Sequence, residues 1–228
     1  MTLDTATGAV LMTGIGDLAD IAERVGTDKL AHGYCAHYED HLRHLRHESI
    51  TLLEVGVYRG QSLRMWSEYF TSPHTVIEGL DIDLGMVIDA LTLDSRVVLT
   101  EGDVNEFVAE CHYDVVIDDG SHHATDIVAA IDRLWPFVKL GGWYVVEDLQ
   151  TQFSAQWGGG PQSPALGKLR NALYELLHDQ PECPLVEFHA YPQIVFMRKV
   201  GPVDEPVEKV ATRTVTGPRA ALRSRSSL

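Results

Sequence analysis

Short apolar segments alternate with amphipathic segments along most of this chain, and this alternation restricts the fold more than any other feature. The expected strands are 50–55, 75–80, 97–99, 114–117 and 143–146, and the helices between or before them are 15–25, 34–45, 62–69 and 125–135. Strands that alternate with helices of this length form a parallel sheet that is covered by helices on both faces.

The last third of the chain departs from this alternation. After a helix expected at 166–178, two apolar segments, 185–190 and 193–198, are separated only by Tyr191-Pro192. So short a connection cannot cross over to a parallel neighbour, so the two segments must form an antiparallel hairpin. The sequence therefore predicts an α/β fold whose mostly parallel, seven-stranded sheet ends in an antiparallel hairpin. This is the Rossmann-like order of class I methyltransferases, which depend on S-adenosylmethionine (SAM).

The length of 228 residues suits one well-buried core. We expect an N-terminal helical cap segment over 1–47, a methyltransferase core over 48–200 and a flexible tail over 201–228, where periodicity is lost and Pro, Arg, Ser and Thr are frequent.

Composition limits the partners and the location. A formal charge of −15 argues against nucleic acid as a partner, because phosphate binding needs a basic surface. No apolar run reaches the length of a membrane span, and the first residues do not resemble a signal peptide. Cys35, Cys111 and Cys183 are scattered and match no zinc site, which favours a cytoplasmic protein with reduced thiols.

The first strand is followed by a glycine turn that is typical of a ligand site. Glu54 is followed by Gly56 and Gly60, at the end of a strand where α/β sheets bind ligands. The charge of Glu54 would repel a diphosphate and suits the cationic methionyl end of SAM. Taken alone, the motif is weak, because a glycine turn after a strand is often only a turn.

Acidic residues at later strand ends strengthen the interpretation as a SAM site. Asp81 follows Gly60 by about 20 residues, where a carboxylate can accept both ribose hydroxyls, and Asp83 competes for that role. Asp103 is placed to reach the adenine amino group, and we also assign Asp118 to the cofactor pocket.

Two acidic pairs end the fourth and fifth strands: Asp118-Asp119 and Glu147-Asp148. On neighbouring strands these carboxylates would crowd one cleft, and their repulsion favours a bound cation. Oxygen ligands without cysteine indicate Mg²⁺, Mn²⁺ or Ca²⁺. Taken singly, each pair could instead be a turn or a helix cap.

A histidine close to these acids is a candidate general base. His122 follows Asp119 by three residues, and His123 is its rival. Deprotonating a sugar hydroxyl by histidine alone is uphill by about 12 kcal/mol. A metal that binds the hydroxyl lowers this barrier, so a histidine base is chemically reasonable only if a metal is bound beside it.

Several segments together resemble the metal-dependent sugar O-methyltransferases. The segments that carry the resemblance are Gly26-Thr27-Asp28-Lys29, His32-Gly33-Tyr34, Tyr38-Glu39, Leu53 to Gly60, Ile117 to His122 and Val146 to Leu149. The resemblance implies that Asp119, Glu147 and Asp148 hold Mg²⁺ and that His122 is the base. It also implies that the Gly-Thr-Asp-Lys segment, with Tyr34 and Tyr38, lies over the cofactor and substrate.

The function implied is transfer of a methyl group from SAM to a sugar hydroxyl of a glycoside or a polysaccharide precursor, such as a methylated mannoside. The chain is shorter than the larger family members, which leaves the sugar open and makes a homodimer only an expectation. The alternatives are a catechol-type O-methyltransferase, a non-catalytic SAM-binding protein and, with less support, a metallohydrolase. The segment 150–167 is a candidate substrate lid, in which we single out Trp157 and Phe153.

Overall fold

The computed structural model describes six parts of the chain: residues 2–3, 10–11, 17–87, 94–178, 185–199 and 223–224. The tail predicted over 201–228 lies outside the described residues apart from Arg223–Ser224, as does Cys183.

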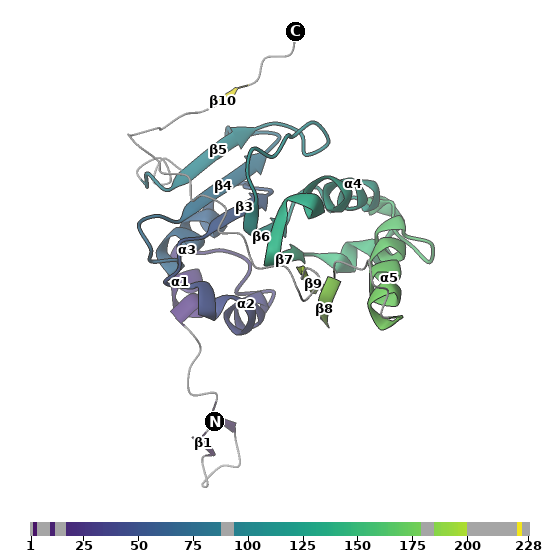
Figure 1. The fold of residues 1–228 in the computed structure, drawn as a ribbon, viewed down its shortest axis with the longest axis horizontal. Helices are drawn as coiled ribbons and strands as arrows, with labels where there is room; N and C mark the ends of the chain where they lie inside the picture. Colours follow the sequence, from purple (N-terminus) through teal and green to yellow (C-terminus); the bar gives the residue numbers. More distant parts are fainter. Residues whose placement is uncertain are drawn as a thin grey trace.

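One large sheet organises the fold, with strands in the order β10-β5-β4-β3-β6-β7-β9-β8 (Figure 1). The strands are β3 (Thr51–Val55), β4 (Val76–Asp81), β5 (Val97–Glu101), β6 (Tyr113–Asp118), β7 (Val138–Val146), β8 (Leu185–Tyr191), β9 (Ile194–Lys199) and the two-residue β10 (Arg223–Ser224). β5, β4, β3, β6 and β7 pair in parallel, whereas β9 pairs antiparallel with both β7 and β8. The mostly parallel sheet of seven strands is therefore confirmed, and β10 adds a short parallel edge to β5.

Helices cover both faces of this sheet (Figure 1). The helices and short helical turns are α1 (Asp17–Val25), α2 (Tyr34–Leu42), η1 (Arg43–Leu45), α3 (Gln61–Tyr69), α4 (Ala124–Leu134), η3 (Trp135–Phe137), η4 (Leu149–Phe153), η5 (Ala155–Trp157) and α5 (Pro164–Leu177). α1, α2 and α3 share one buried core with one face of the sheet, and α4 and α5 share a second core with the other. Neighbouring residues of β3 show the alternation, since Leu52 belongs to the first core and Leu53 to the second.

The segment predicted as an N-terminal cap contributes to the first core. Leu18 and Ala22 of α1 and Tyr38 of α2 are fully buried there. Because α1 and α2 pack on the sheet, the loop that joins them is held above the ends of the strands. A separate two-strand pair, β1 (Thr2–Leu3) with β2 (Val10–Leu11), precedes these helices.

The predicted C-terminal hairpin is confirmed, with Tyr191 paired to Ile194 across a two-residue turn. The predicted start of β7 is wrong, because the strand begins at Val138 and not at Trp143. Gly141 and Gly142 lie inside it, where the pairing with β6 shifts register. A side chain at Gly142 would come within 2.8 Å of the Asp114 carbonyl oxygen, so the irregular pairing requires a glycine.

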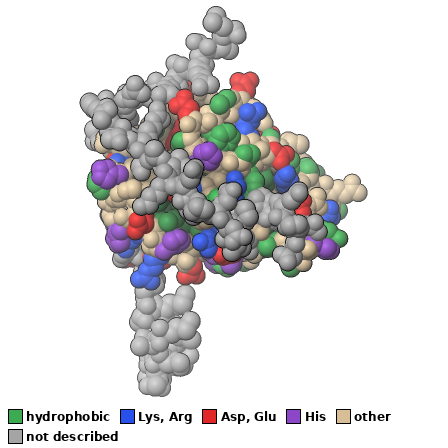
Figure 2. Space-filling model, viewed as in Figure 1, with side chains coloured by type: hydrophobic (Ala, Val, Ile, Leu, Met, Phe, Trp, Pro, Cys, Tyr) green, Lys and Arg blue, Asp and Glu red, His purple; other side chains and the backbone are tan. Residues whose placement is uncertain are grey.

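The surface of the described residues carries charges of both signs. The face drawn in Figure 2 intersperses Lys and Arg with acidic and hydrophobic side chains, and its described residues form no continuous basic surface. No helix in the described part of the chain has both the length and the hydrophobicity needed to cross a bilayer. Cys35 and Cys111 are free thiols, and the cytoplasmic location stays a prediction.

Candidate active site

A cavity of about 660 Å³ opens at the carboxyl ends of β3, β4, β5 and β6. Four residues predicted from the sequence to bind the cofactor line it: Gly56, Asp81, Asp103 and Asp118. Each follows or ends a different strand, so the parallel sheet itself brings them to one edge.

The glycine turn after β3 has two separate roles. Gly56 has a φ of +91°, and a Cβ there would lie 2.0 Å from the backbone oxygen of Asp119, so no side chain fits. This close approach lets the turn after β3 pack on the end of β6. Gly60, with a φ of +80°, is the residue from which α3 starts, and it does not line the cavity.

Asp81 and Asp103 are fixed by backbone hydrogen bonds. Oδ2 of Asp81 accepts from the backbone N–H groups of Val57 at 2.7 Å and Tyr58 at 2.9 Å, which ties the end of β4 to the glycine turn. Oδ1 of Asp103 accepts from the backbone N–H of Asn105 at 2.8 Å. Both carboxylates are therefore held in place before any ligand binds.

Asp118 is the most deeply placed acid of the cavity wall. It is 5% exposed, and its Oδ2 has no hydrogen-bond partner among the described residues. Burial raises the pKa of Asp118 to about 7. An acceptor of this kind needs a donor from a ligand, because an unpaired buried polar atom is costly.

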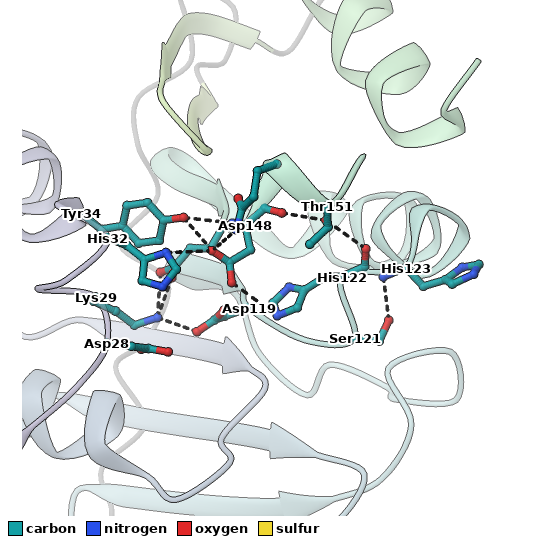
Figure 3. Close-up of polar contacts among 12 residues, drawn as sticks. Asp28, Lys29, His32, Tyr34, Asp119, Ser121, His122, His123, Asp148 and Thr151 are labelled. Atoms are coloured by element: carbon teal, nitrogen blue, oxygen red, sulfur yellow. Dashed lines mark hydrogen bonds and ion pairs between the residues drawn. The ribbon is translucent and has the colours of Figure 1, made fainter. Parts of the chain in front are cut away.

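In the wall of the same cavity, Asp119, His122 and Asp148 form a group whose possible metal-ligand atoms all lie within 4.8 Å of one another. Asp119 follows β6 and Asp148 follows β7, and the parallel register pairs Asp118 with Val146, so the two strand ends meet. Nε2 of His122 lies 3.6 Å from Oδ2 of Asp148 (Figure 3). We call Asp119, His122 and Asp148 the outer group, since each is partly exposed.

The carboxylate of Asp148 is held ionised from several sides. Burial opposes ionisation, but hydrogen bonds from Tyr34 and Gln150 and the nearby His122 keep the pKa of Asp148 below its usual value. The Tyr34 hydroxyl donates to Oδ1 of Asp148 at 2.7 Å, and Nδ1 of His32 lies 3.4 Å from the same oxygen. Asp148 therefore stays available as an anionic ligand.

Two residues of the outer group have a left-handed backbone that is unusual for non-glycine residues. His122 has a φ of +57° and Asp148 a φ of +55°. The carbonyl oxygen of His122 accepts a hydrogen bond of 2.8 Å from Nε2 of Gln152, whose Oε1 accepts from Ser163 at 2.9 Å. Gln152 is fully buried, so this chain of bonds fixes the strained turn that carries His122.

Beneath the outer group, Lys29, Tyr38, Glu54 and Glu147 form a buried cluster that we call the inner group; none is more than 2% exposed. Nζ of Lys29 lies 2.8 Å from Oε1 of Glu147 and 3.2 Å from Oε1 of Glu54. The Tyr38 hydroxyl also donates to Glu147. Burial, and after it the charge of Asp119, raise the pKa of Glu147, while the ion pair and hydrogen bond with Lys29 oppose this shift.

Two residues with predicted ligand contacts lie in the inner group. Glu54, predicted to bind the methionyl end of SAM, is fully buried, pairs with Lys29 and Ser62, and is not among the residues that line the cavity. Glu147, predicted to be a metal ligand, lies outside the outer group, and both of its oxygens accept from Lys29.

None of the four residues predicted to contact the substrate is among those that line the cavity. Tyr34 and Tyr38 are at most 1% exposed, and their hydroxyls donate to Asp148 and Glu147. His123 turns away from the outer group (Figure 3), its Nδ1 3.0 Å from the Thr125 hydroxyl. Trp157 does not line the cavity, although its ring centroid is 6.2 Å from that of His122.

The predicted lid contains short helical turns, and Phe153, singled out in it, is 76% exposed. It forms η4 and η5 before Ser163 caps α5. A Cβ at Gly159 would come within 2.3 Å of the Gln152 carbonyl oxygen, so the glycine lets this segment pack against Gln152.

Two contributions were missed from the sequence: the pairing of Lys29 within the inner group, and Gln152 behind His122. The resemblance places the Gly-Thr-Asp-Lys segment over the cofactor, and its Gly26, Thr27 and Asp28 line the cavity. A signal for the first existed, because a Thr-Asp-Lys run between two glycines joins α1 to α2. No local pattern marks Gln152, since its role depends on where the segment after β7 folds back.

The strand order and the acidic cavity at the ends of the parallel strands define a class I SAM-dependent methyltransferase fold. Residues 53–149 match the Methyltransf_24 family, described as a methyltransferase domain. A methyltransferase domain of this family is therefore present in this part of the chain.

Curated relatives carry names of sugar methyltransferases. The chain is 32% identical over 215 residues to mycinamicin VI 2″-O-methyltransferase of Micromonospora griseorubida, covering 80% of this chain and 52% of the relative. It is 33% identical over 216 residues to 8-demethyl-8-(2-methoxy-alpha-L-rhamnosyl)-tetracenomycin-C 3′-O-methyltransferase of Streptomyces olivaceus, covering 81% and 54%. The chain thus spans about half the length of these relatives.

A solved structure agrees with this relationship. The MycE methyltransferase of the mycinamycin biosynthetic pathway, in complex with Mg, SAH and mycinamycin VI, superposes with a TM-score of 0.70 at 32% identity, covering 83% of this chain and 55% of that chain.

Proposed function

We propose that this protein transfers a methyl group from SAM to a sugar hydroxyl of a glycosylated small molecule, in a reaction that depends on Mg²⁺. The observation that carries the proposal is the outer group, in which two carboxylates and a histidine meet in the wall of the cavity. The names of the curated relatives support an acceptor that is a sugar, and the solved complex with Mg and SAH supports both cofactors.

The cavity residues fit the donor. Asp118 offers a buried acceptor without a partner, which suits an N–H donor of the ligand. Asp81 and Asp103 are held in place by backbone bonds, and their positions at two strand ends suit the ribose hydroxyls and the adenine amino group.

The outer group fits a hard dication. Its carboxylates supply oxygen ligands of the kind that Mg²⁺ prefers. Four acids, Glu54, Asp119, Glu147 and Asp148, lie in the two groups with Lys29, so negative charge exceeds positive. Asp119 and Asp148 would hold the metal. Glu147 stays a candidate third ligand, because Lys29 joins it to Asp119.

His122 is the proposed general base. A divalent ion held by Asp119 and Asp148 would supply Lewis-acid polarisation of the acceptor hydroxyl. Nε2 of His122 takes the proton of that hydroxyl, and the carboxylate of Asp148, 3.6 Å away, stabilises the imidazolium that forms. The fixed backbone of His122 keeps the ring at this position, since Gln152 holds its carbonyl oxygen.

The direct test is a methyl-transfer assay over a panel of glycosides and catechols, with EDTA and Mg²⁺ add-back. We expect turnover of a glycoside that EDTA abolishes and Mg²⁺ restores, and NMR of the product to place the methyl group on a sugar oxygen. Turnover of catechols alone would contradict the proposed acceptor, and turnover that resists EDTA would contradict the proposed metal.

The homodimer stays a prediction.

A further inference from the structure

A lysine ammonium is buried where the ends of three strands converge. Lys29, in the loop between α1 and α2, is 1% exposed, and its Nζ lies 2.7 Å from Oδ2 of Asp119. The same nitrogen lies 2.8 Å from both carboxylate oxygens of Glu147 and 3.2 Å from Glu54. Lysines are almost never fully buried unless they are paired, so this contact set defines a specific role.

The three acids around Lys29 come from different strands. Glu54 lies within β3, Asp119 follows β6 and Glu147 follows β7. Without a cation between them, their like charges would repel one another at these strand ends. Lys29 places one positive charge among the three carboxylates, and its ion pair with Asp119 is drawn in Figure 3.

The bridge also sets the direction of Asp119. Lys29 binds Oδ2 of Asp119, which leaves Oδ1 outside this ion pair. Asp119 belongs to the outer group with His122 and Asp148. Lys29 is thus placed to fix the orientation of the Asp119 carboxylate relative to His122 and Asp148.

We propose that Lys29 is a positioning residue for the metal site, a built-in cation that holds Asp119 and Glu147 in the arrangement that binds one divalent ion. This inference rests on the proposed metal-dependent function. It assigns to Lys29 no contact with the substrate or the donor, and Lys29 is absent from the cavity wall.

The test measures Mn²⁺ binding by calorimetry and by electron paramagnetic resonance, on enzyme without donor or acceptor. Residues that hold metal ligands in place typically contribute 10–100-fold to metal affinity, and we expect Lys29→Met to weaken Mn²⁺ binding by about this factor. SAH binding is measured in parallel and should change less than about threefold, because Lys29 is not expected to contact the donor. A loss of Mn²⁺ affinity without a loss of SAH affinity distinguishes a positioning role from general unfolding.

Lys139→Met is the matched control. Nζ of Lys139 lies 2.7 Å from Oδ2 of Asp114, at the opposite end of β6, so this variant also removes a lysine–aspartate pair. We expect it to bind Mn²⁺ like the wild type.

A double variant keeps the test decisive if Lys29→Met does not fold. Lys29→Met/Glu54→Gln removes a buried anion together with the cation, and it is compared with Glu54→Gln alone. Weaker Mn²⁺ binding by the double variant supports the proposal.

Two results overturn the inference while the proposed function survives. The first is that Lys29→Met binds Mn²⁺ as tightly as the wild type or more tightly. The second is that the double variant binds Mn²⁺ as tightly as Glu54→Gln or more tightly. A wild type that binds no Mn²⁺ overturns the metal-dependent function itself, and the inference with it.

Discussion

The inner and outer groups lie at the same edge of the sheet and use the same kinds of residue, yet they differ in what balances their charge. In the inner group, Lys29 supplies a cation from the chain itself, and Glu54 and Glu147 are almost completely buried around it. In the outer group, Asp119 and Asp148 are partly exposed and line the cavity. The difference shows how one acidic cluster can be divided into a structural half and a half open to a ligand.

The tyrosines follow the same division. Tyr38 donates to Glu147 of the inner group, and Tyr34 donates to Asp148 of the outer group. They lie four residues apart, one turn along α2, so a single helix supports both halves.

The largest effect should come from removing the proposed base. His122→Ala is expected to lower kcat by about 100–10,000-fold, the usual contribution of a general base, while Mn²⁺ affinity stays within about threefold. Steady-state kinetics and calorimetry measure the two quantities. A large loss of Mn²⁺ affinity would instead identify His122 as a metal ligand.

Removing a carboxylate of the outer group should act on the metal. Asp148→Asn is expected to weaken Mn²⁺ binding by at least about 10–100-fold, because it removes the ligand charge itself. Asp114→Asn, at the far end of β6, serves as the control and should bind Mn²⁺ normally. Equal Mn²⁺ affinities for Asp148→Asn and Asp114→Asn would contradict the assignment of Asp148 to a metal site.

The two tyrosines allow a smaller, matched comparison. Tyr38→Phe should lower the free energy of unfolding by about 2 kcal/mol, because a hydrogen bond to a buried charge is lost, with little change in Mn²⁺ affinity. Tyr34→Phe should instead weaken Mn²⁺ binding several-fold. Urea unfolding and calorimetry on both variants test this, and the reverse pattern would contradict the division.

The smallest effect concerns the stability of the fold in acid. Burial and the neighbouring His189 lower the pKa of His41 to about 4, below the value of about 6.5 for an unfolded chain. Protonation therefore favours the unfolded state, so this stability is complete above pH 6.5 and is lost as the pH falls through 4.

Because His41 is partly exposed, we expect a loss of only about 1–2 kcal/mol from this group. Urea unfolding of the wild type and of His41→Gln at several pH values checks it. The variant should lose less stability in acid than the wild type. An equal loss would exclude His41 as the cause.

Local patterns in the sequence predicted most of the fold. The alternation of strands and helices indicated the parallel sheet, and the two-residue connection near Pro192 indicated the hairpin, because periodicity and loop length are local properties. The start of β7 was misjudged, since the Gly141-Gly142 pair reads as a strand boundary until its pairing with β6 is known.

The sequence by itself determined which acids stand at the ends of the strands, because a residue's place along a strand depends only on its neighbours in the chain. The tertiary structure alone decided what each acid contacts. Glu147 and Asp148 are adjacent in sequence, yet one turns toward Lys29 and the other toward His122. Lys29 reaches Glu147 across 118 positions of the chain. Such contacts depend on the packing of α1 and α2 against the sheet, and no local pattern encodes it.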